Sequence, residues 1–380
     1  MIAGASAASV AAACSTRPGK DDVPRSSPDA SVEGKVEFDA REGSAALGAV
    51  TRLGPRWETS DPFLFCAHHD DSYPAGNEQL GPQDDLQGRR LGRDFAGKDG
   101  WRMYHGRTVP GFPRHPHRGF ETVTVVRSGL LDHSDSLGAR ARYGDGDVQW
   151  LTAGQGINHA EMFPLLASDA PNPFELFQIW LNLPRANKMV PPAFKMLWDE
   201  TVPRHRARDA QGREVTLTMV AGAYGEIVPP APPPDSYAAQ ADSDVAIWTI
   251  KLEPGAQWIL PAATEGTHRS LYFFRGSGIR VGGQAIPDYH RVELRGDARV
   301  AIKGGTEVCE LLLLQGRPIG EPVARHGPFV MNTQDEIRQA YADYRSTGFG
   351  GWPWDGDDPV HGPESERFAE LIDGSRDQPA

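Results

Sequence analysis

Cysteines, long apolar runs and excess positive charge are all scarce in this sequence, and each shortage excludes a class of protein. The 380 residues include only three cysteines, Cys14, Cys66 and Cys309, too few and too scattered for a disulfide framework or a cysteine-based metal site. No apolar run approaches the length of a membrane span, so no transmembrane segment is predicted. The formal net charge of -12 argues against nonspecific binding to nucleic acid or anionic lipid.

The first forty residues are interpreted as a leader. Residues 2–13 are small and apolar and end at Cys14, and a stretch rich in Ser, Pro, Asp and Lys follows to residue 35. The cationic segment that should precede an export signal is missing. Residues 1–40 are therefore either a disordered leader on a cytoplasmic protein or the remnant of an export signal, in which case Cys14 would anchor an exported lipoprotein.

Glycine and proline, by contrast, are abundant, with 42 and 32 residues, and they divide the chain into short apolar segments. This pattern is typical of an all-β sandwich or barrel, and a chain of this length is expected to form two domains. In the first half, strands are predicted at residues 121–127, 130–133, 139–143, 148–153 and 174–183. In the second half they are predicted at residues 215–221, 245–252, 270–275, 291–294, 299–302 and 308–314.

One amphipathic helix is predicted near the C-terminus. Thr333 and Glu336 form a capping box, and apolar residues recur every three or four positions after it. Glycines at 348, 350 and 351 should end this helix. Two other segments show no clear period: residues 68–100 are expected to form a long loop with His68 and His69 exposed, and residues 351–380 a flexible acidic tail.

Two pairs of potential metal ligands stand in strand-like surroundings. His115 and His117 form one pair, and His159 and Glu161 form the other. Side chains two residues apart project from the same face of a strand, so the two pairs can converge on one ion. Three imidazoles and one carboxylate suit Fe(II), Mn(II), Ni(II), Cu(II) or Zn(II). The alternatives are a structural zinc site or histidines that bind no metal, and Pro116 places the first pair at a strand start or edge.

The same residues lie in motifs that resemble the pirin family. The matching segments are Gly111 to Thr124, which reads GFPRHPHRGFETVT, Gly146 to Met162, which reads GDVQWLTAGQGINHAEM, and Gly327 to Gln334, which reads GPFVMNTQ. The resemblance implies a bicupin of two tandem jelly-roll barrels, with a metal-binding cupin domain at 41–192 and a cupin domain without ligands at 193–350. It also implies one iron-type ion, held by the two ligand pairs.

What the resemblance implies about activity is a quercetin 2,3-dioxygenase, which opens a flavonol ring with dioxygen. Glu161 would be either a simple ligand or a residue that leaves the metal to take the substrate hydroxyl proton. Glu121 is a candidate for orienting a ligand, and Phe120, Trp150 and Met162 are candidates for the pocket wall. The alternative is a non-catalytic, redox-sensing iron protein that acts through a protein partner, since no DNA-reading motif is present.

Overall fold

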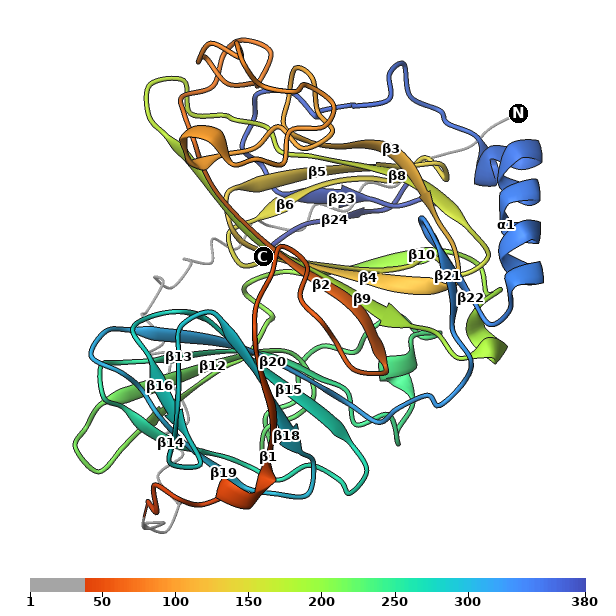
Figure 1. Cartoon of the computed structure of the whole chain (residues 1–380). Helices are drawn as coiled ribbons and strands as arrows, with labels where there is room; N and C mark the ends of the chain where they lie inside the picture. Colours follow the sequence, from red (N-terminus) through yellow and green to blue (C-terminus); the bar gives the residue numbers. More distant parts are fainter. Residues whose placement is uncertain (1–37) are drawn as a thin grey trace, which may run out of the picture. The chain divides into compact units, whose positions relative to one another are not determined.

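The computed structural model describes residues 38–380, so Cys14 and all but the last three residues of the expected leader lie outside the described residues. Within this range the strands form two tandem barrels, and a single α-helix, α1 (Gln334–Thr347), lies near the C-terminus (Figure 1). The predicted all-β class with one late helix is confirmed. None of the described helices has the length and apolar character needed to span a membrane. Short 3-10 helices are η1 (Ser44–Ala46), η2 (Lys98–Gly100), η3 (Arg185–Asn187), η4 (Tyr237–Ala239) and η5 (Gly348–Gly350).

The N-terminal barrel consists of two sheets that share one core, with strand orders β10-β7-β4-β9-β2 and β24-β23-β6-β5-β8-β3. The first sheet contains β2 (Phe63–Tyr73), β4 (Phe120–Ser128), β7 (Val148–Thr152), β9 (Asn172–Asn182) and β10 (Ala193–Leu197). The second contains β3 (Gly111–His117), β5 (Leu130–Asp135), β6 (Arg140–Gly144), β8 (Ile157–Met162), β23 (Phe368–Glu370) and β24 (Arg376–Asp377).

The C-terminal barrel consists of a seven-stranded and a four-stranded sheet, with orders β1-β18-β15-β20-β13-β12-β11 and β14-β19-β16-β17. The larger sheet contains β1 (Leu47–Arg52), β11 (Arg204–Arg208), β12 (Glu214–Ala221), β13 (Ala246–Leu252), β15 (His268–Arg275), β18 (His290–Arg295) and β20 (Cys309–Gly316). The smaller contains β14 (Gln257–Leu260), β16 (Ile279–Val281), β17 (Gln284–Ile286) and β19 (Val300–Lys303). Every strand predicted from the sequence is present to within two residues of its expected limits.

The chain changes barrels at places that the sequence did not indicate. β1 pairs with β18, so residues 47–52 complete the C-terminal barrel although 41–192 was expected to be one domain (Figure 1). β10 pairs with β7, so residues 193–197 complete the N-terminal barrel. Strand pairing therefore crosses the expected limits, because each barrel takes an edge strand from the neighbouring stretch of chain.

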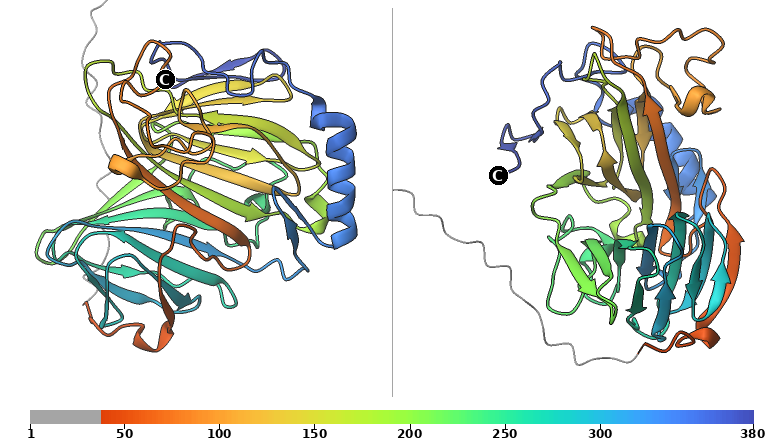
Figure 2. Two further views of the ribbon diagram at one scale, coloured as in Figure 1. Left: turned by 45° about the horizontal axis from the view of Figure 1, so that its top comes forward. Right: turned by 90° about the vertical axis from the view of Figure 1, so that its left-hand side faces the viewer.

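The last part of the C-terminal domain returns to the N-terminal barrel. The hairpin of β21 (Ala324–His326) and β22 (Phe329–Met331) bonds to it, because the Val330 N–H donates to the Arg118 carbonyl at 3.0 Å. The Arg118 guanidinium lies 2.7 Å from the Asp343 carboxylate of α1. α1 begins with the predicted capping box of Thr333 and Glu336 and ends at Gly348. Figure 2 shows α1 beside the N-terminal strands in a second view.

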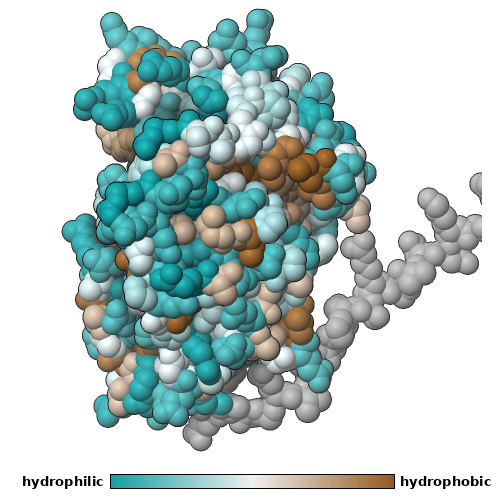
Figure 3. All heavy atoms as spheres, turned by 90° about the vertical axis from the view of Figure 1, so that its right-hand side faces the viewer, coloured by the Kyte–Doolittle hydropathy of each residue, from teal (hydrophilic) through white to brown (hydrophobic). Residues whose placement is uncertain are grey.

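Separate apolar clusters fill and join the barrels. One apolar cluster fills the interior of the C-terminal barrel and includes Leu271, Phe273 and Leu311. Phe177 of the N-terminal barrel and Tyr272 of the C-terminal barrel share another cluster. Cys66 and Cys309 are fully buried, as expected. On the face shown in Figure 3, hydrophilic residues prevail and apolar ones form only small patches.

Buried charges also link the two barrels, and they explain why the expected loop at residues 68–100 is partly a strand. β2 continues to Tyr73, and the His68 side chain is only 7% exposed because it lies 2.8 Å from the Glu175 carboxylate. Arg127 and Arg275 contact the same carboxylate at 2.5 and 3.0 Å. Burial alone would raise the pKa of Glu175, but the His68 hydrogen bond and both arginines lower it to about 2. The expectation that His68 and His69 are exposed is therefore wrong for both residues.

The acidic C-terminal segment also differs from its expected flexibility. β23 pairs with the edge strand β6, where Phe368 lies opposite Arg142, and Ala369 is fully buried. Arg140 donates to the Glu370 carboxylate at 2.7 Å. The composition of residues 351–380 suggested a solvated tail because the strand that orders this segment lies more than 200 positions earlier in the sequence.

Candidate metal centre

Two neighbouring strands carry the predicted metal ligands. β3 is the edge strand of its sheet and pairs only with β8, in agreement with the limit that Pro116 imposes. In their antiparallel register His115 lies directly opposite His159, and His117 projects from the same face as His115 two residues later. The spacing seen in the sequence thus becomes a triangle of three imidazoles.

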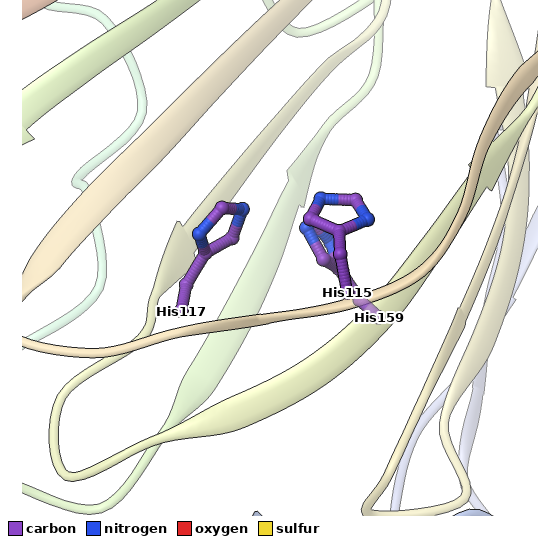
Figure 4. Close-up of side chains that lie close together, drawn as sticks. All are labelled: His115, His117 and His159. Atoms are coloured by element: carbon purple, nitrogen blue, oxygen red, sulfur yellow. The ribbon is translucent and has the colours of Figure 1, made fainter. Parts of the chain in front are cut away.

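The three rings point toward one another (Figure 4). Their centroids are 4.4 Å apart for His115 and His159, 4.8 Å for His115 and His117, and 4.9 Å for His117 and His159. One nitrogen of each ring lies within 4.8 Å of one nitrogen of both others. This separation is suitable for a transition metal that is bound at about 2.0–2.2 Å from each nitrogen.

Hydrogen bonds determine which ring nitrogens face the centre. His115 Nδ1 lies 2.9 Å from the Pro113 carbonyl, and His117 Nδ1 lies 3.4 Å from the Pro328 carbonyl. Since a carbonyl only accepts, both Nδ1 atoms carry hydrogen and both Nε2 atoms keep their lone pairs. Among the described residues neither nitrogen of His159 has a hydrogen-bond partner, although both are buried. A buried polar group left in this way costs about 1–3 kcal/mol, so the residues present fit a metal ion.

Burial keeps all three imidazoles neutral, which is the state in which histidine binds metal. Desolvation lowers the pKa of His115 to about 4 and holds the pKa values of His117 and His159 well below the ordinary value. His115 also lowers the pKa of His117 and of His159, since a second positive charge so close would be repelled. At neutral pH the lone pairs are therefore available to an ion.

Glu161 stands beside this triangle. Its Oε2 lies 3.7 Å from His159 Nε2, and the Thr124 hydroxyl donates to its Oε1 at 3.4 Å. The group of ligand atoms that lie within 4.8 Å of one another contains the three histidines and does not include this carboxylate. Burial raises the pKa of Glu161 to about 7. Glu161 is therefore a buried carboxyl group beside the centre, with a pKa close to neutral pH.

A pocket of about 1350 Å³ opens onto these residues. His115, His117 and Glu161 line it, together with aromatic and aliphatic side chains that suit a flat apolar ligand. The apolar part includes Phe112, Leu131, Phe163, Leu176 and Trp180. Arginines that can attract an anionic group also line the pocket, namely Arg56, Arg107, Arg114 and Arg325.

Comparisons with known proteins agree with this architecture. The family model Pirin matches residues 46–181, and the model of the pirin C-terminal cupin domain matches residues 247–350. Human pirin is 33% identical over 315 residues, which cover 81% of this chain and 90% of that protein. The chain belongs to the pirin family. The expected bicupin of two tandem cupin domains is thereby confirmed.

Two further relatives of this pirin carry the name of an enzyme. A Pseudomonas aeruginosa protein with the provisional name quercetin 2,3-dioxygenase is 37% identical over 240 residues, which cover 63% of this chain and 79% of that protein. The crystal structure of quercetin 2,3-dioxygenase from Acinetobacter baumannii aligns with a TM-score of 0.62 at 26% identity. That alignment covers 80% of this chain and 96% of the other.

In this pirin, Glu121 and Trp150 face away from the three histidines. Glu121 accepts hydrogen bonds from the Trp150 indole at 3.1 Å and from the Thr152 hydroxyl at 2.8 Å. Its second oxygen accepts from the Ser236 hydroxyl at 2.9 Å, so it does not orient a ligand as expected. Trp150 belongs to the apolar cluster that the two barrels share and does not line the pocket. The expectation fails because both faces of β4 are buried, and burial alone does not tell which face the pocket lies on.

The other two pocket candidates differ from each other. The Phe120 ring lies 5.1 Å from the His117 ring and 4.3 Å from the Trp180 ring, so it supports the centre although it does not line the pocket. Met162 packs with Leu80 and Val109 in a small separate cluster and does not line the pocket. Of the four candidates, only Phe120 touches a histidine of the triangle.

Sequence reasoning missed a fourth histidine next to the centre. His133 is fully buried on β5 and lies directly opposite Glu161, and its ring centroid is 5.6 Å from that of His159. His133 Nε2 lies 3.2 Å from the Asp135 carboxylate. The sequence did contain the same signal, since His133 and Asp135 have the two-residue spacing of the other ligand pairs. It was missed because the predicted strand ended at His133 and left Asp135 in a turn.

The C-terminal barrel offers no comparable site among the described residues. His268, at the start of β15, is exposed, and within residues 38–380 no group of ligand atoms that lie close together contains a residue of this barrel. The second group of potential ligands, His68, Asp70 and Glu175, lies in the N-terminal barrel and is neutralised by Arg127 and Arg275. The prediction that metal ligands occur only in the first barrel agrees with this geometry.

Proposed function

We propose that this pirin is a metal-dependent dioxygenase that opens the ring of a flavonol such as quercetin. His115, His117 and His159 would hold one divalent ion, with Glu161 as fourth ligand or as the neighbouring base. Iron is the first choice, and manganese, nickel, copper and zinc fit the same donors. The observation that carries the proposal is the convergence of three neutral imidazoles, two of which, His115 and His117, line a large pocket with aromatic walls.

The reaction is internally balanced. Both atoms of dioxygen enter the products, one ring carbon leaves as carbon monoxide, and the flavonol becomes an ester, so no outside reductant is needed. A bound transition metal would supply the electron exchange with dioxygen that side chains do not provide. The small aromatic substrate and dioxygen are therefore the only reaction partners that the proposal requires.

The protein's own groups prepare the substrate. Glu161, with a pKa of about 7, can take the proton of the flavonol hydroxyl, and the Thr124 hydroxyl donates to its Oε1 and helps to hold the carboxyl group in place. Phe112, Phe163 and Trp180 provide flat apolar surface for the substrate rings. Arg107 and Arg325 favour the anion that forms when the proton is lost.

The test is dioxygen uptake and carbon monoxide release with quercetin, measured on protein fully loaded with Fe(II). The wild type should convert quercetin. The rate of this reaction should fall at least a hundredfold in His115→Ala, because one of the three imidazoles that would hold the metal is missing. His268→Ala is the matched control, since this histidine is exposed in the C-terminal barrel. Iron-loaded wild type that leaves quercetin unchanged between about pH 6 and 9 would refute the proposal for this substrate.

The second candidate is a redox-sensing iron protein that acts through a protein partner. One contact favours it: His117 Nδ1 donates to the Pro328 carbonyl, which lies between β21 and β22 and so connects the centre with a surface hairpin next to α1. Oxidation of iron that moves His117 would then move this hairpin. Hydrogen exchange of the Fe(II) and Fe(III) forms tests it, and equal protection of residues 324–347 in both forms excludes such a switch.

A further inference from the structure

A second group of polar side chains reaches the same pocket from the side of β2. His69 and Asp71 lie on this strand, and Tyr104 lies in the segment between β2 and β3 (Figure 1). The Tyr104 hydroxyl is 2.6 Å from His69 Nδ1 and 2.6 Å from the Asp71 carboxylate. The Arg102 guanidinium donates to the other oxygen of Asp71 at 2.8 Å. Four side chains thus form one continuous chain of hydrogen bonds.

The direction of these hydrogen bonds follows from the protons available. Burial raises the pKa of Asp71 to about 6, so the carboxyl is ionised at neutral pH, and burial raises the pKa of Tyr104 well above its ordinary value. The single Tyr104 proton is therefore donated to Asp71, and the tyrosine oxygen can only accept from His69. Burial lowers the pKa of His69 to about 3, so its ring is neutral. With hydrogen on Nδ1, the Nε2 atom of His69 must be an acceptor.

This acceptor faces the substrate pocket. His69 lines the pocket, and its Nε2 has no hydrogen-bond partner among the described residues. The His69 ring packs edge-on against Phe112 with centroids 5.7 Å apart, and the Phe112 ring is in turn 6.3 Å from the ring of His115. One aromatic side chain therefore separates His69 from the metal centre, so a single planar ligand can contact both.

The backbone that positions Tyr104 is held in an unusual conformation. Tyr104 has a φ of 56°, in the left-handed region that side chains other than glycine seldom adopt. Two backbone hydrogen bonds with Asp94, at 2.8 and 2.9 Å, fix this residue, and the Asp94 carboxylate is itself bound by the buried Arg89 at 2.9 Å. Strain that the surroundings enforce in this way is typical of functional positions.

We propose that His69 determines substrate specificity by accepting a hydrogen bond from a hydroxyl group on the far ring of an aromatic ligand. Tyr104 and Asp71 are positioning residues, because they fix the ring and its proton but do not reach the ligand. The ligand is then a polyhydroxylated aromatic compound that places one polar end at His69 and the other at the histidine triangle. That it is a flavonol rests on the proposed function, whereas the acceptor role of His69 does not.

The experiment compares two probes that differ by one donor. 2-Naphthol can donate a hydrogen bond, and 2-methoxynaphthalene, with the same rings, cannot. Dissociation constants of both are measured by fluorescence titration of the full chain loaded with Zn(II), for the wild type and for His69→Phe, Tyr104→Phe and His105→Phe. His105 is the matched control, because it also lines the pocket and its ring is also 5.7 Å from Phe112.

The wild type should prefer 2-naphthol about tenfold, as expected for one buried hydrogen bond. His69→Phe should abolish the preference, Tyr104→Phe should reduce it, and His105→Phe should leave the ratio as it is. Nitrogen-15 NMR should show His69 protonated at Nδ1 in the wild type, and Tyr104→Phe should shift hydrogen toward Nε2. This second measurement separates positioning from a merely structural role.

Three outcomes overturn the inference: no preference in the wild type, an unchanged preference in His69→Phe, or loss of the preference in His105→Phe instead. If His69→Phe does not fold, the inference is tested by the ratio of the two dissociation constants in Tyr104→Phe and by the tautomer of His69. An unchanged ratio together with an unchanged tautomer would then overturn it. Failure of the proposed function is read separately, as absence of dioxygen uptake with quercetin. A wild type that consumes quercetin while His69→Phe retains the naphthol preference refutes this inference alone.

Discussion

Replacing His159 with leucine is expected to stabilise the metal-free protein, although it removes a predicted metal ligand. Both ring nitrogens of His159 are buried without a hydrogen-bond partner among residues 38–380. Each unsatisfied group costs about 1–3 kcal/mol, and leucine fills a similar volume without polar atoms. Allowing for imperfect packing, metal-free His159→Leu should be more stable than the metal-free wild type by about 2 kcal/mol.

Metal should reverse this order. Free ion at about one thousand times its dissociation constant stabilises a protein by about 4 kcal/mol, and only the wild type should gain this amount. Urea unfolding of both proteins, with and without a chelator, measures the two differences. His268→Leu serves as control, because that exposed histidine should change neither value.

The reasoning is refuted if metal-free His159→Leu is less stable than the wild type by 3 kcal/mol or more, as for an ordinary core substitution. It is also refuted if metal stabilises the variant as much as the wild type. The first result would mean that the His159 nitrogens are satisfied in the metal-free protein, and the second that the ion binds elsewhere.

Three further predictions concern stability and mobility. Because the pKa of Glu175 is lowered to about 2, the ionised carboxylate stabilises the fold fully above its ordinary pKa of 4.5, and this stabilisation is lost as the pH falls from 4.5 to 2. The free energy of unfolding should therefore fall by about 3 kcal/mol over this range when it is measured as a function of pH. Glu175→Gln should make the free energy of unfolding less dependent on pH in the same range. Thr333→Ala should cost about 1 kcal/mol in urea unfolding, whereas Thr333→Ser should not. Arg118→Ala removes the contact with Asp343 and should speed hydrogen exchange in α1, while equal exchange would show that the apolar contacts of α1 suffice.

Most strands could be predicted from the glycine-rich turns that separate them. The histidine triangle could be predicted because side chains two residues apart lie on the same face of a strand. His115, His117 and His159 could be found because side chains on adjacent strands meet whenever their spacing and register agree. The apolar middle of β9 and the capping box of α1 were equally local signals. The signal for each of these features is a short stretch of sequence, although His115 and His159 meet only because β3 pairs with β8.

Features that depend on distant partners could not be predicted. β2 contains buried charges, and only the pairing of His68 with Glu175 and of Asp71 with Arg102 makes their burial favourable. β23 is ordered by pairing with β6, which its composition does not reveal. The same limit hid the contact of His69 with Tyr104, because a loop must fold back onto β2 before the two side chains meet.

Metal stoichiometry tests the central claim most directly. Full-length protein is dialysed without oxygen against Fe(II), and in parallel against Mn(II), Ni(II), Cu(II) or Zn(II), and bound metal is counted by mass spectrometry. One ion per chain is predicted for the wild type, with loss in each of His115→Ala, His117→Ala and His159→Ala and full retention in His268→Ala. Wild type that binds none of these ions, or histidine variants that retain the full amount, would contradict the account.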